Sequence, residues 1–297
     1  MQFIRDIYQA ARAASRPVIS FEFFTPKTDA GERRFFAEIM PQLAVLRPDY
    51  CSVTYGAGGS TRGRTFDMVE QIQRDFGIPA MAHLTCVGAT RENIRGLLQE
   101  ARARGIQNLL ALRGDPPEGA ERFEPAAGGF RYAVELVRLI REVGGFSIGV
   151  AGFPEGHPEC AEGKLADWRY LRSKVEAGAD FVLSQLFFDN TWFHEFRAYL
   201  TGELGVRVPV VPGILAILNG RQLQRLTSLC GATVPKAVRD RLVELDHDDA
   251  AAAEYGIELA AQQCADLLER DVPGLHFYTL NKVRSTRAVL RRLGLRS

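Results

Sequence analysis

The chain has 297 residues, of which 46% are hydrophobic and 25% charged, with 37 Lys and Arg against 36 Asp and Glu. This composition is typical of a globular protein with a large core, and a net charge of +1 gives no electrostatic argument for a nucleic-acid or membrane partner. The five cysteines are scattered without a C-x-x-C pair, so they suggest neither a disulfide framework nor a zinc site.

After an opening helix over residues 3–14, patterns typical of strands and helices alternate along the chain. Short apolar runs predict strands over residues 18–24, 50–55, 80–85, 109–112, 147–153, 180–188, 208–215 and 275–280. Helical spacing of apolar residues predicts helices over residues 35–46, 64–76, 90–104, 130–143, 163–177, 191–203, 220–229, 235–244, 250–270 and 284–293. Such alternation implies parallel strands joined by right-handed crossovers. We therefore predict an α/β protein, a (β/α)8 TIM barrel forming a single domain over residues 1–297, with an extra N-terminal helix and extra helices before the last strand.

One strand end stands out. The apolar run over residues 109–112 is followed by Arg113, Gly114 and Asp115, and a Pro-Pro pair prevents the strand from continuing. Enzymes with this fold place their chemistry at the carboxyl ends of the strands. The alternative is that both charges are solvated turn residues, as most such charges are.

The loop Gly56–Thr61 resembles a dinucleotide-binding fingerprint, but Thr61 replaces its third glycine and no ribose-binding acid follows at the expected distance. We interpret it as a tight loop that lets the backbone approach a ligand closely.

Glu22 is the most informative single residue, because it lies in mid-strand among Phe21, Phe23 and Phe24. An unpaired carboxylate is costly to bury, and burial raises the pKa of a carboxyl group. Glu22 is therefore a candidate general acid near neutral pH. The alternative is a structural ion pair with an Arg or Lys of the barrel interior.

Five other polar residues have weaker signals. His83 ends a strand, and Gln185 interrupts an apolar one, where a buried amide needs a polar partner or a ligand. His157 has no second histidine at ligand spacing, so we expect no metal. Asp167 and Lys174 are seven residues apart on one helix face, which by default is a solvated pair.

The chain closely resembles the methylenetetrahydrofolate reductase family. The matching blocks span most of the sequence in family order: Ser20–Phe24, Ser52–Ala57, His83–Cys86, Ala111–Asp115, His157–Glu159, Gln185–Asp189, Pro212–Leu215 and His276–Asn281. The resemblance implies a βα barrel with non-covalent FAD at the carboxyl ends of the strands. It also implies two half-reactions, in which NADH or NADPH reduces FAD and methylenetetrahydrofolate then takes the hydride to become methyltetrahydrofolate, a step of one-carbon metabolism and methionine biosynthesis.

The resemblance also implies roles for individual residues. Glu22 would protonate the departing nitrogen as the methylene bridge opens, Asp115 would bind folate and tune the reduced flavin, and Gln185 would bind the pterin. The positions that contact FAD in the family are Thr54, His83, Arg113, Gly114, Asp115, Tyr132, Ala133, Phe153, His157, Asp167 and Lys174.

Five positions depart from the family pattern. Phe153 replaces a common Tyr, and Tyr170 and Ser173 replace Asn and Arg of some bacterial members, so phosphate binding would rest on Lys174 and backbone donors. The strand over residues 208–215 is commonly followed by a Pro and, four residues later, by an aromatic that stacks on substrate. The departing residues at these two positions are Ala216 and Gly220.

Two alternatives stay open. A flavin-free barrel that binds folate for a methyltransferase partner would not need the FAD-contacting set, and a phosphate-binding aldolase barrel would need a Schiff-base Lys that the strands lack. The charged start and the absence of an 18-residue apolar run predict a cytoplasmic protein. We expect a homo-oligomer of unspecified size, and no inhibition by S-adenosylmethionine, because the chain ends at Ser297 without the regulatory domain of eukaryotic members.

Overall fold

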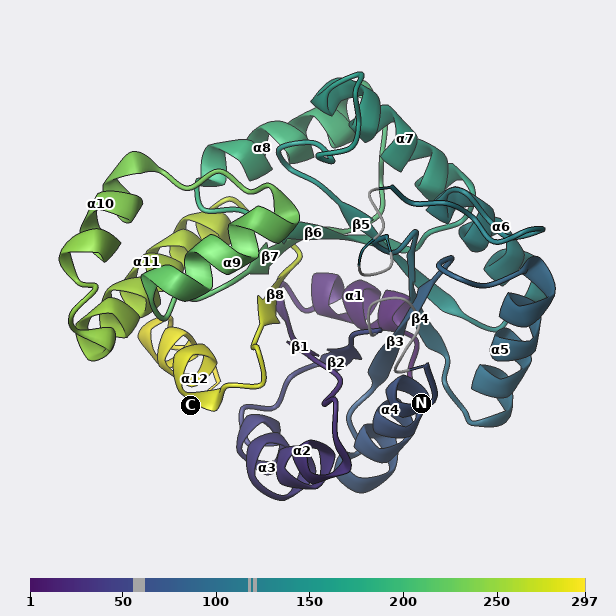
Figure 1. Ribbon diagram of the computed structural model, residues 1–297, viewed down its shortest axis with the longest axis horizontal. Coiled ribbons are helices and arrows are strands. Elements are labelled where there is room, and N and C mark those ends of the chain that lie inside the picture. Colours follow the sequence, from purple (N-terminus) through teal and green to yellow (C-terminus); the bar gives the residue numbers. More distant parts are fainter. Residues whose placement is uncertain (56–61, 117–118, 120–121, 297) are drawn as a thin grey trace.

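The computed structural model describes residues 1–55, 62–116, 119 and 122–296. Its eight strands are all parallel and follow one another around a closed barrel in chain order, with β8 pairing back to β1 (Figure 1). The strands are β1 (Val18–Phe23), β2 (Tyr50–Val53), β3 (Ala80–Thr85), β4 (Asn108–Leu112), β5 (Ser147–Gly152), β6 (Phe181–Leu186), β7 (Val210–Ile214) and β8 (Gly274–Tyr278). The predicted TIM barrel is confirmed, because every expected strand is present.

All the helices except α1 lie in a ring outside the barrel. They are α1 (Ile4–Ala13), α2 (Asp29–Arg34), α3 (Met40–Ala44), α4 (Arg62–Phe76), α5 (Arg91–Ala103), α6 (Ala133–Val143), α7 (Lys164–Glu176), α8 (Asn190–Ala198), α9 (Gly220–Cys230), α10 (Lys236–Glu244), α11 (Asp249–Glu269) and α12 (Val283–Arg292). The extra helices predicted before the last strand are α9, α10 and α11. Two expected helices are α-helical only in part: the helix expected over residues 35–46 begins with a π-helical turn at Phe35–Ile39, and the helix expected over residues 191–203 ends with one at Tyr199–Glu203.

Local sequence explains several boundaries. Thr90 caps α5, as a Thr before a helix predicts, and forms a reciprocal capping box with Asn93. Gly144 ends α6 at a φ of +72°, a conformation that side chains other than glycine rarely adopt. The barrel wall between strands and helices is filled by a continuous apolar core in which large side chains such as Trp168 and Phe196 are fully buried.

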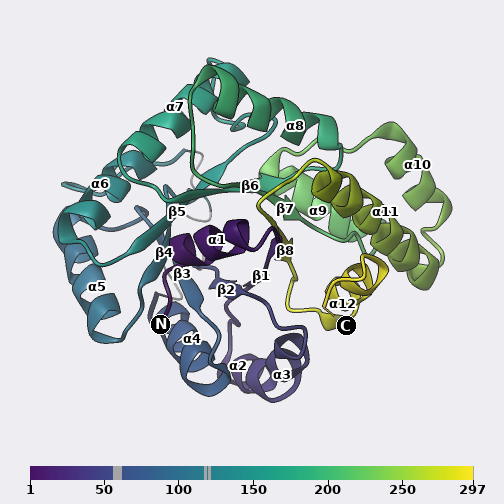
Figure 2. The same ribbon diagram turned by 180° about the vertical axis from the view of Figure 1, so that it is seen from behind.

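The N-terminal helix α1 closes the amino-terminal opening of the barrel, as the view from behind shows (Figure 2). Its backbone is fixed there by Asn108 of β4, whose Oδ1 accepts from the Ile4 N–H at 2.8 Å. Tyr8 points into the barrel, where its hydroxyl lies 3.0 Å from that of Tyr50. With α1 across this end, the opposite mouth, where the carboxyl ends of the strands meet, is the place where enzymes of this fold bind their ligands.

Candidate active site

The side chain of Glu22 lies inside the barrel on β1 and is 11% exposed. Three neighbours converge on one of its oxygens, Oε2: His83 Nε2 and His276 Nε2 each lie 3.3 Å away, and the Ser52 hydroxyl donates to it at 3.4 Å. Among the described residues none hydrogen-bonds the other oxygen, Oε1. The carboxylate therefore has one oxygen held by the protein and one available to a ligand.

The histidines are themselves fixed by serines. The Ser52 hydroxyl lies 2.7 Å from His83 Nε2, and the Ser20 hydroxyl lies 2.8 Å from His276 Nδ1. His276 is fully buried and His83 almost so. Together these five residues form a buried polar cluster supplied by β1, β2, β3 and β8.

This cluster corrects the expectation for Glu22. Burial alone would raise the pKa of its carboxyl group, as the sequence suggested, but the charges and hydrogen bonds of His83 and His276 outweigh burial and lower the pKa to about 2. The alternative, a structural ion pair with an Arg or Lys, is not observed either, because the charged partners of the carboxylate among the described residues are two histidines. Glu22 is consequently a carboxylate in the ligand-free site.

Tyr278 links this cluster to the opposite part of the barrel wall. It pairs with Glu22 in the register of β1 and β8, and its hydroxyl donates to the Ser184 carbonyl of β6 at 2.7 Å. The phenol can reach β6 only because Gly213 of β7 has no side chain: a Cβ there would lie 2.7 Å from the Tyr278 hydroxyl. Gln185, the next residue on β6, accepts the Leu186 N–H through its own Oε1 and is half-buried.

A second group of expected residues lies on the β4, β5 and α7 side. Arg113 forms a bidentate ion pair with Glu159, with N···O distances of 2.6 and 3.0 Å. The rings of Phe153 and His157 pack edge to face, with their centroids 4.5 Å apart. Burial, and next the charge of Arg113, lowers the pKa of His157. Asp115 is exposed just beyond Arg113 at the carboxyl end of β4.

Asp167 and Lys174 are not the solvated pair that their spacing suggested by default. The Lys174 ammonium donates to the Ala151 carbonyl of β5 at 2.7 Å, and burial lowers its pKa to about 8 against the opposing effect of Asp167. Burial likewise raises the pKa of Asp167, while Lys174 and His157 act to lower it. Both side chains therefore face the barrel wall from α7.

The remaining expected positions frame the same mouth. Thr54 follows β2, where its hydroxyl accepts from the Thr25 N–H at 3.3 Å. Tyr132 is the 58% exposed N-cap residue of α6, and Ala133 begins that helix. The loop Gly56–Thr61 and Pro117 lie outside the described residues.

Comparison with known proteins identifies the family. Residues 7–294 match the family model described as methylenetetrahydrofolate reductase. The chain is 36% identical to the 5,10-methylenetetrahydrofolate reductase of Pectobacterium carotovorum over 96% of its own length and 93% of that protein. The chain belongs to the methylenetetrahydrofolate reductase family.

One further sequence relative and one solved structure extend the comparison. A probable methylenetetrahydrofolate reductase (NADH) of rice is 39% identical over 99% of this chain but only 51% of its own length, so the chain spans about half of that protein. A solved protein of Clostridium thermocellum, described as binding two copies of 5-methyl-5,6,7,8-tetrahydrofolic acid, superposes with a TM-score of 0.65 at 14% identity and covers 96% of this chain and 97% of its own. That likeness shows the fold alone.

Sequence reasoning missed the partners of Glu22, although His276 and Ser20 stand in blocks that carry the resemblance to the reductase family. No local pattern marks them, because 254 residues separate His276 from Glu22. The one available signal was a polar residue inside an otherwise apolar predicted strand, which applies to Ser20, Ser52 and His276 alike.

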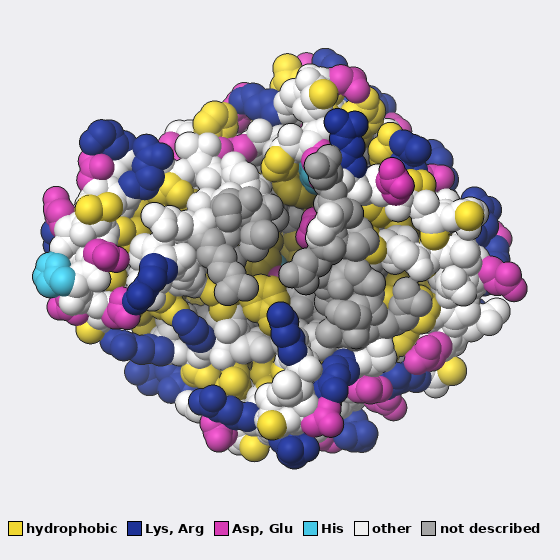
Figure 3. Space-filling model, viewed as in Figure 1, with side chains coloured by type: hydrophobic (Ala, Val, Ile, Leu, Met, Phe, Trp, Pro, Cys, Tyr) yellow, Lys and Arg dark blue, Asp and Glu magenta, His cyan; other side chains and the backbone are white. Residues whose placement is uncertain are grey.

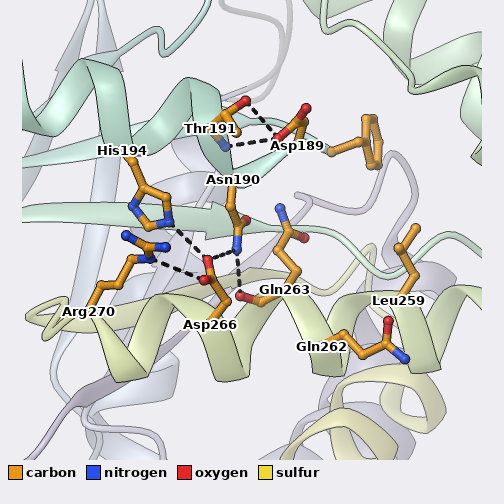
Figure 4. A pocket seen from close by; sticks show the side chains of 10 residues that line it. Asp189, Asn190, Thr191, His194, Leu259, Gln262, Gln263, Asp266 and Arg270 are labelled. Atoms are coloured by element: carbon orange, nitrogen blue, oxygen red, sulfur yellow. Dashed lines mark hydrogen bonds and ion pairs between the residues drawn. The ribbon is translucent and has the colours of Figure 1, made fainter.

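A separate cavity of about 360 Å³ lies between α8 and α11 (Figure 4). There Asp266 of α11 accepts from Asn190 at 2.6 Å and from Arg270 at 3.1 Å, and lies 2.9 Å from His194 Nε2. The hydrogen bond from His194 contributes most to lowering the pKa of Asp266 to about 2. None of the residues expected to form the reductase site lines this cavity. We therefore interpret the hydrogen bonds around Asp266 as structural contacts that hold α8 against α11.

Among the described residues, no group of three or more His, Cys, Asp or Glu side chains could hold a metal ion. The five cysteines are free. No described helix is long and apolar enough to cross a membrane.

Proposed function

We propose that the protein reduces 5,10-methylenetetrahydrofolate to 5-methyltetrahydrofolate with a reduced nicotinamide, using bound FAD in a ping-pong reaction at one site. Family membership supports the substrate, and the observation that carries the site assignment is the Glu22 carboxylate at the open mouth of the barrel. It is the buried acidic group of the family's first block, with one oxygen left for a ligand.

The residues on the β4, β5 and α7 side fit FAD. Thr85 at the end of β3 has a buried hydroxyl with no hydrogen-bond partner among the described residues, and it packs against Gly114. Such an unsatisfied group is rare unless a ligand or water supplies the bond. Arg113 and Lys174 bring positive charge to the same wall, and His157 adds a neutral imidazole, which together suit an anionic pyrophosphate. When bound, FAD would accept a hydride from nicotinamide and pass it to folate.

The departures at α7 limit which side chains can hold the phosphates. The Tyr170 hydroxyl donates to Glu162 at 2.9 Å, and the Ser173 hydroxyl donates to the Arg169 carbonyl in the preceding turn. Both hydroxyls are thus already engaged away from the barrel. Among the α7 side chains, phosphate binding therefore rests on Lys174, with backbone donors beside it.

Glu22 supplies the proton that opening of the methylene bridge requires. Because the carboxylate is ionised in the ligand-free site, it must take up a proton before it acts. His83 or His276, when protonated, can donate that proton through the existing 3.3 Å contact. Transfer from an imidazolium to the carboxylate turns two buried charges into two neutral groups, so it does not increase the charge of the buried site.

Colour distinguishes this function from that of a flavin-free folate carrier. We expect the purified protein to be yellow with flavin absorption, or to become so when FAD is added. A colourless protein that binds folate but takes up no FAD would reject the reductase.

Asp115→Asn is expected to weaken folate binding more than FAD binding. The exposed carboxylate lies at the mouth beyond Gly114, so its charge faces the incoming substrate. Loss of a charged hydrogen-bonding group typically weakens binding by about 1.5–3 kcal/mol, roughly ten- to 150-fold. Titration of FAD into apoprotein and of folate into holoprotein measures both affinities, and equal losses would show that Asp115 is only structural.

Gly220→Phe is expected to lower the KM for the nicotinamide roughly three- to tenfold from an unusually high wild-type value. Gly220 begins α9 and offers no ring to stack on substrate, whereas an aromatic platform contributes about 0.5–1.5 kcal/mol beyond its buried area. A Cβ at this position is accommodated, since its nearest neighbour would be Asp246 Oδ1 at 3.9 Å. Anaerobic flavin reduction against NADH and NADPH concentration tests this, and tight wild-type saturation without gain in the variant would contradict it.

A further inference from the structure

The two histidines that contact Glu22 lie in different surroundings, although each is 3.3 Å from the same carboxylate oxygen. His276 is fully buried, whereas His83 keeps 6% of its surface exposed. Both ring nitrogens of His276 have partners, Glu22 at Nε2 and Ser20 at Nδ1. The contacts of His83 with Glu22 and Ser52 are all made by Nε2, and no described residue hydrogen-bonds its Nδ1. The two rings are therefore not equivalent as proton donors.

Strand register places His276 on the amino-terminal side of Glu22. Ser20 is two residues before Glu22 on β1, and it pairs with both Tyr50 of β2 and His276 of β8. These three residues form a layer beneath the carboxylate, farther from the open mouth that Figure 3 views and that the carboxyl ends of the strands surround. A proton that enters from the mouth therefore reaches Glu22 before it reaches His276.

The space beneath this layer is closed by phenols and apolar side chains. The Tyr50 ring stacks on the imidazole of His276, with centroids 6.3 Å apart and an interplanar angle of 19°. Tyr8 of α1, the helix that crosses this end of the barrel in Figure 2, holds the Tyr50 hydroxyl at 3.0 Å. Met81 and Phe181 pack in the same apolar cluster. Burial raises the pKa of Tyr50 to about 12 and that of Tyr8 well above its usual value, so neither phenol supplies a proton near neutral pH.

The hydrogen-bond partners of His276 determine which ring nitrogen carries its proton. A neutral imidazole has one donor and one acceptor nitrogen. Nε2 faces the Glu22 carboxylate, which can only accept, so Nε2 carries the hydrogen and Nδ1 accepts from the Ser20 hydroxyl at 2.8 Å. A second hydrogen on Nδ1 would force the Ser20 hydrogen toward the Leu275 carbonyl at 3.5 Å, beyond the usual range for a hydroxyl donor. His276 is thus built to donate a hydrogen bond, not to be recharged from solvent.

We propose that Ser20 and Tyr50 are positioning residues that hold His276 as a fixed Nε2–H donor to Glu22, and that His83 alone returns the proton to this carboxylate. This inference rests on the proposed function, which makes Glu22 the acid. The protonated His83 ring gives its Nε2 hydrogen to the carboxylate, which leaves a neutral ring and a neutral acid. After Glu22 has passed the proton to the folate nitrogen, His83 regains one at Nδ1 from water in the mouth.

The kinetic test compares His83→Gln and His276→Gln in FAD-loaded protein, with each half-reaction measured by stopped flow. Glutamine keeps an N–H donor for Glu22 but transfers no proton. We expect the folate half-reaction to slow by about 10²-fold or more in His83→Gln, the lower end of the usual contribution of a proton-transferring group, and by less than about tenfold in His276→Gln. Flavin reduction by nicotinamide should change less than the folate step in His83→Gln. The matched control is His247→Gln, an exposed histidine after α10, which should behave as the wild type.

Nitrogen NMR of protein with isotope-labelled histidine reads the tautomer of His276 without any turnover. Among the five histidines, the signals of His276 are those absent from His276→Gln. The wild type should show a protonated Nε2 and an unprotonated Nδ1. Ser20→Ala should shift the Nδ1 resonance, because it removes the hydrogen bond to this atom. Tyr50→Leu removes the stacked ring and should shift the ring signals of His276, whereas Tyr50→Phe keeps the ring and should shift them less.

Three outcomes would overturn the proposal. They are a protonated Nδ1 of His276 in the wild type, an unchanged Nδ1 resonance in Ser20→Ala, and a folate half-reaction slowed as much in His276→Gln as in His83→Gln. If the wild type reduces no methylenetetrahydrofolate, the proposed function fails and the role of His83 fails with it. The tautomer of His276 then still decides whether Ser20 and Tyr50 hold this ring.

Discussion

Glu22→Gln is expected to leave flavin reduction by nicotinamide nearly unchanged and to slow the folate half-reaction by about 10²–10⁴-fold, the range that a general acid typically contributes. The amide keeps the size of the carboxyl group but cannot donate an acidic proton. It also cannot receive one from His83 or His276, which lie 3.3 Å from the carboxylate in the wild type. Single-turnover stopped-flow measurement of each half-reaction separates the two effects.

The variant is compared with Glu142→Gln, which removes an exposed carboxylate that pairs with Arg95 on the outer helices. That control should leave both half-reactions unchanged. A folate half-reaction slowed less than about tenfold in Glu22→Gln, well below the usual contribution of an acid, would show that another group supplies the proton. Equal slowing of both half-reactions would instead indicate that the substitution disturbs the whole buried cluster.

Gly256→Ala is expected to be the most destabilising conservative change in the α11 region. A Cβ at this position would lie 1.9 Å from the Ile217 carbonyl oxygen and 2.7 Å from its carbon, both backbone atoms that cannot rotate away. Overpacking typically costs about 1–3 kcal/mol, and we expect the upper end. At roughly 2–4 °C per kcal/mol, the Tm should fall by roughly 6–12 °C.

Gly96→Ala is the matched control, since Gly96 is also inside a helix but a Cβ there meets nothing within 4 Å. It should stabilise the protein by about 0.5–1 kcal/mol, because alanine loses less backbone entropy than glycine. Thermal unfolding of the two variants beside the wild type measures the contrast. A Tm for Gly256→Ala within about 2 °C of the wild type, less than 1 kcal/mol by the same conversion, would mean that α11 and the segment after β7 separate easily.

The architecture followed from sequence because its signals are local. Strand and helix periods alternate along the chain, Thr90 marks the start of α5, and neither needs information from distant residues. The sequence also placed Arg113 and Asp115 at the carboxyl end of a strand and Glu22 within another strand, and all carboxyl ends of a parallel barrel point the same way. The spacing of apolar residues did not predict the two π-helical turns, because it does not distinguish them from the α-helices that they adjoin.

The chemistry of the site was decided by contacts between residues far apart in the chain. Apolar neighbours in sequence predicted a raised pKa for Glu22, but closure of the barrel brings His83 of β3 and His276 of β8 to the same oxygen and reverses the shift. Similarly, a glycine inside a strand such as Gly213 normally weakens that strand. In the folded barrel, the missing side chain of Gly213 leaves the space in which the Tyr278 hydroxyl reaches the Ser184 carbonyl. Sequence alone determined the barrel and which residues approach its mouth; the tertiary structure decided their charge states and partners, because electrostatic interactions depend on distances that only the closed barrel sets.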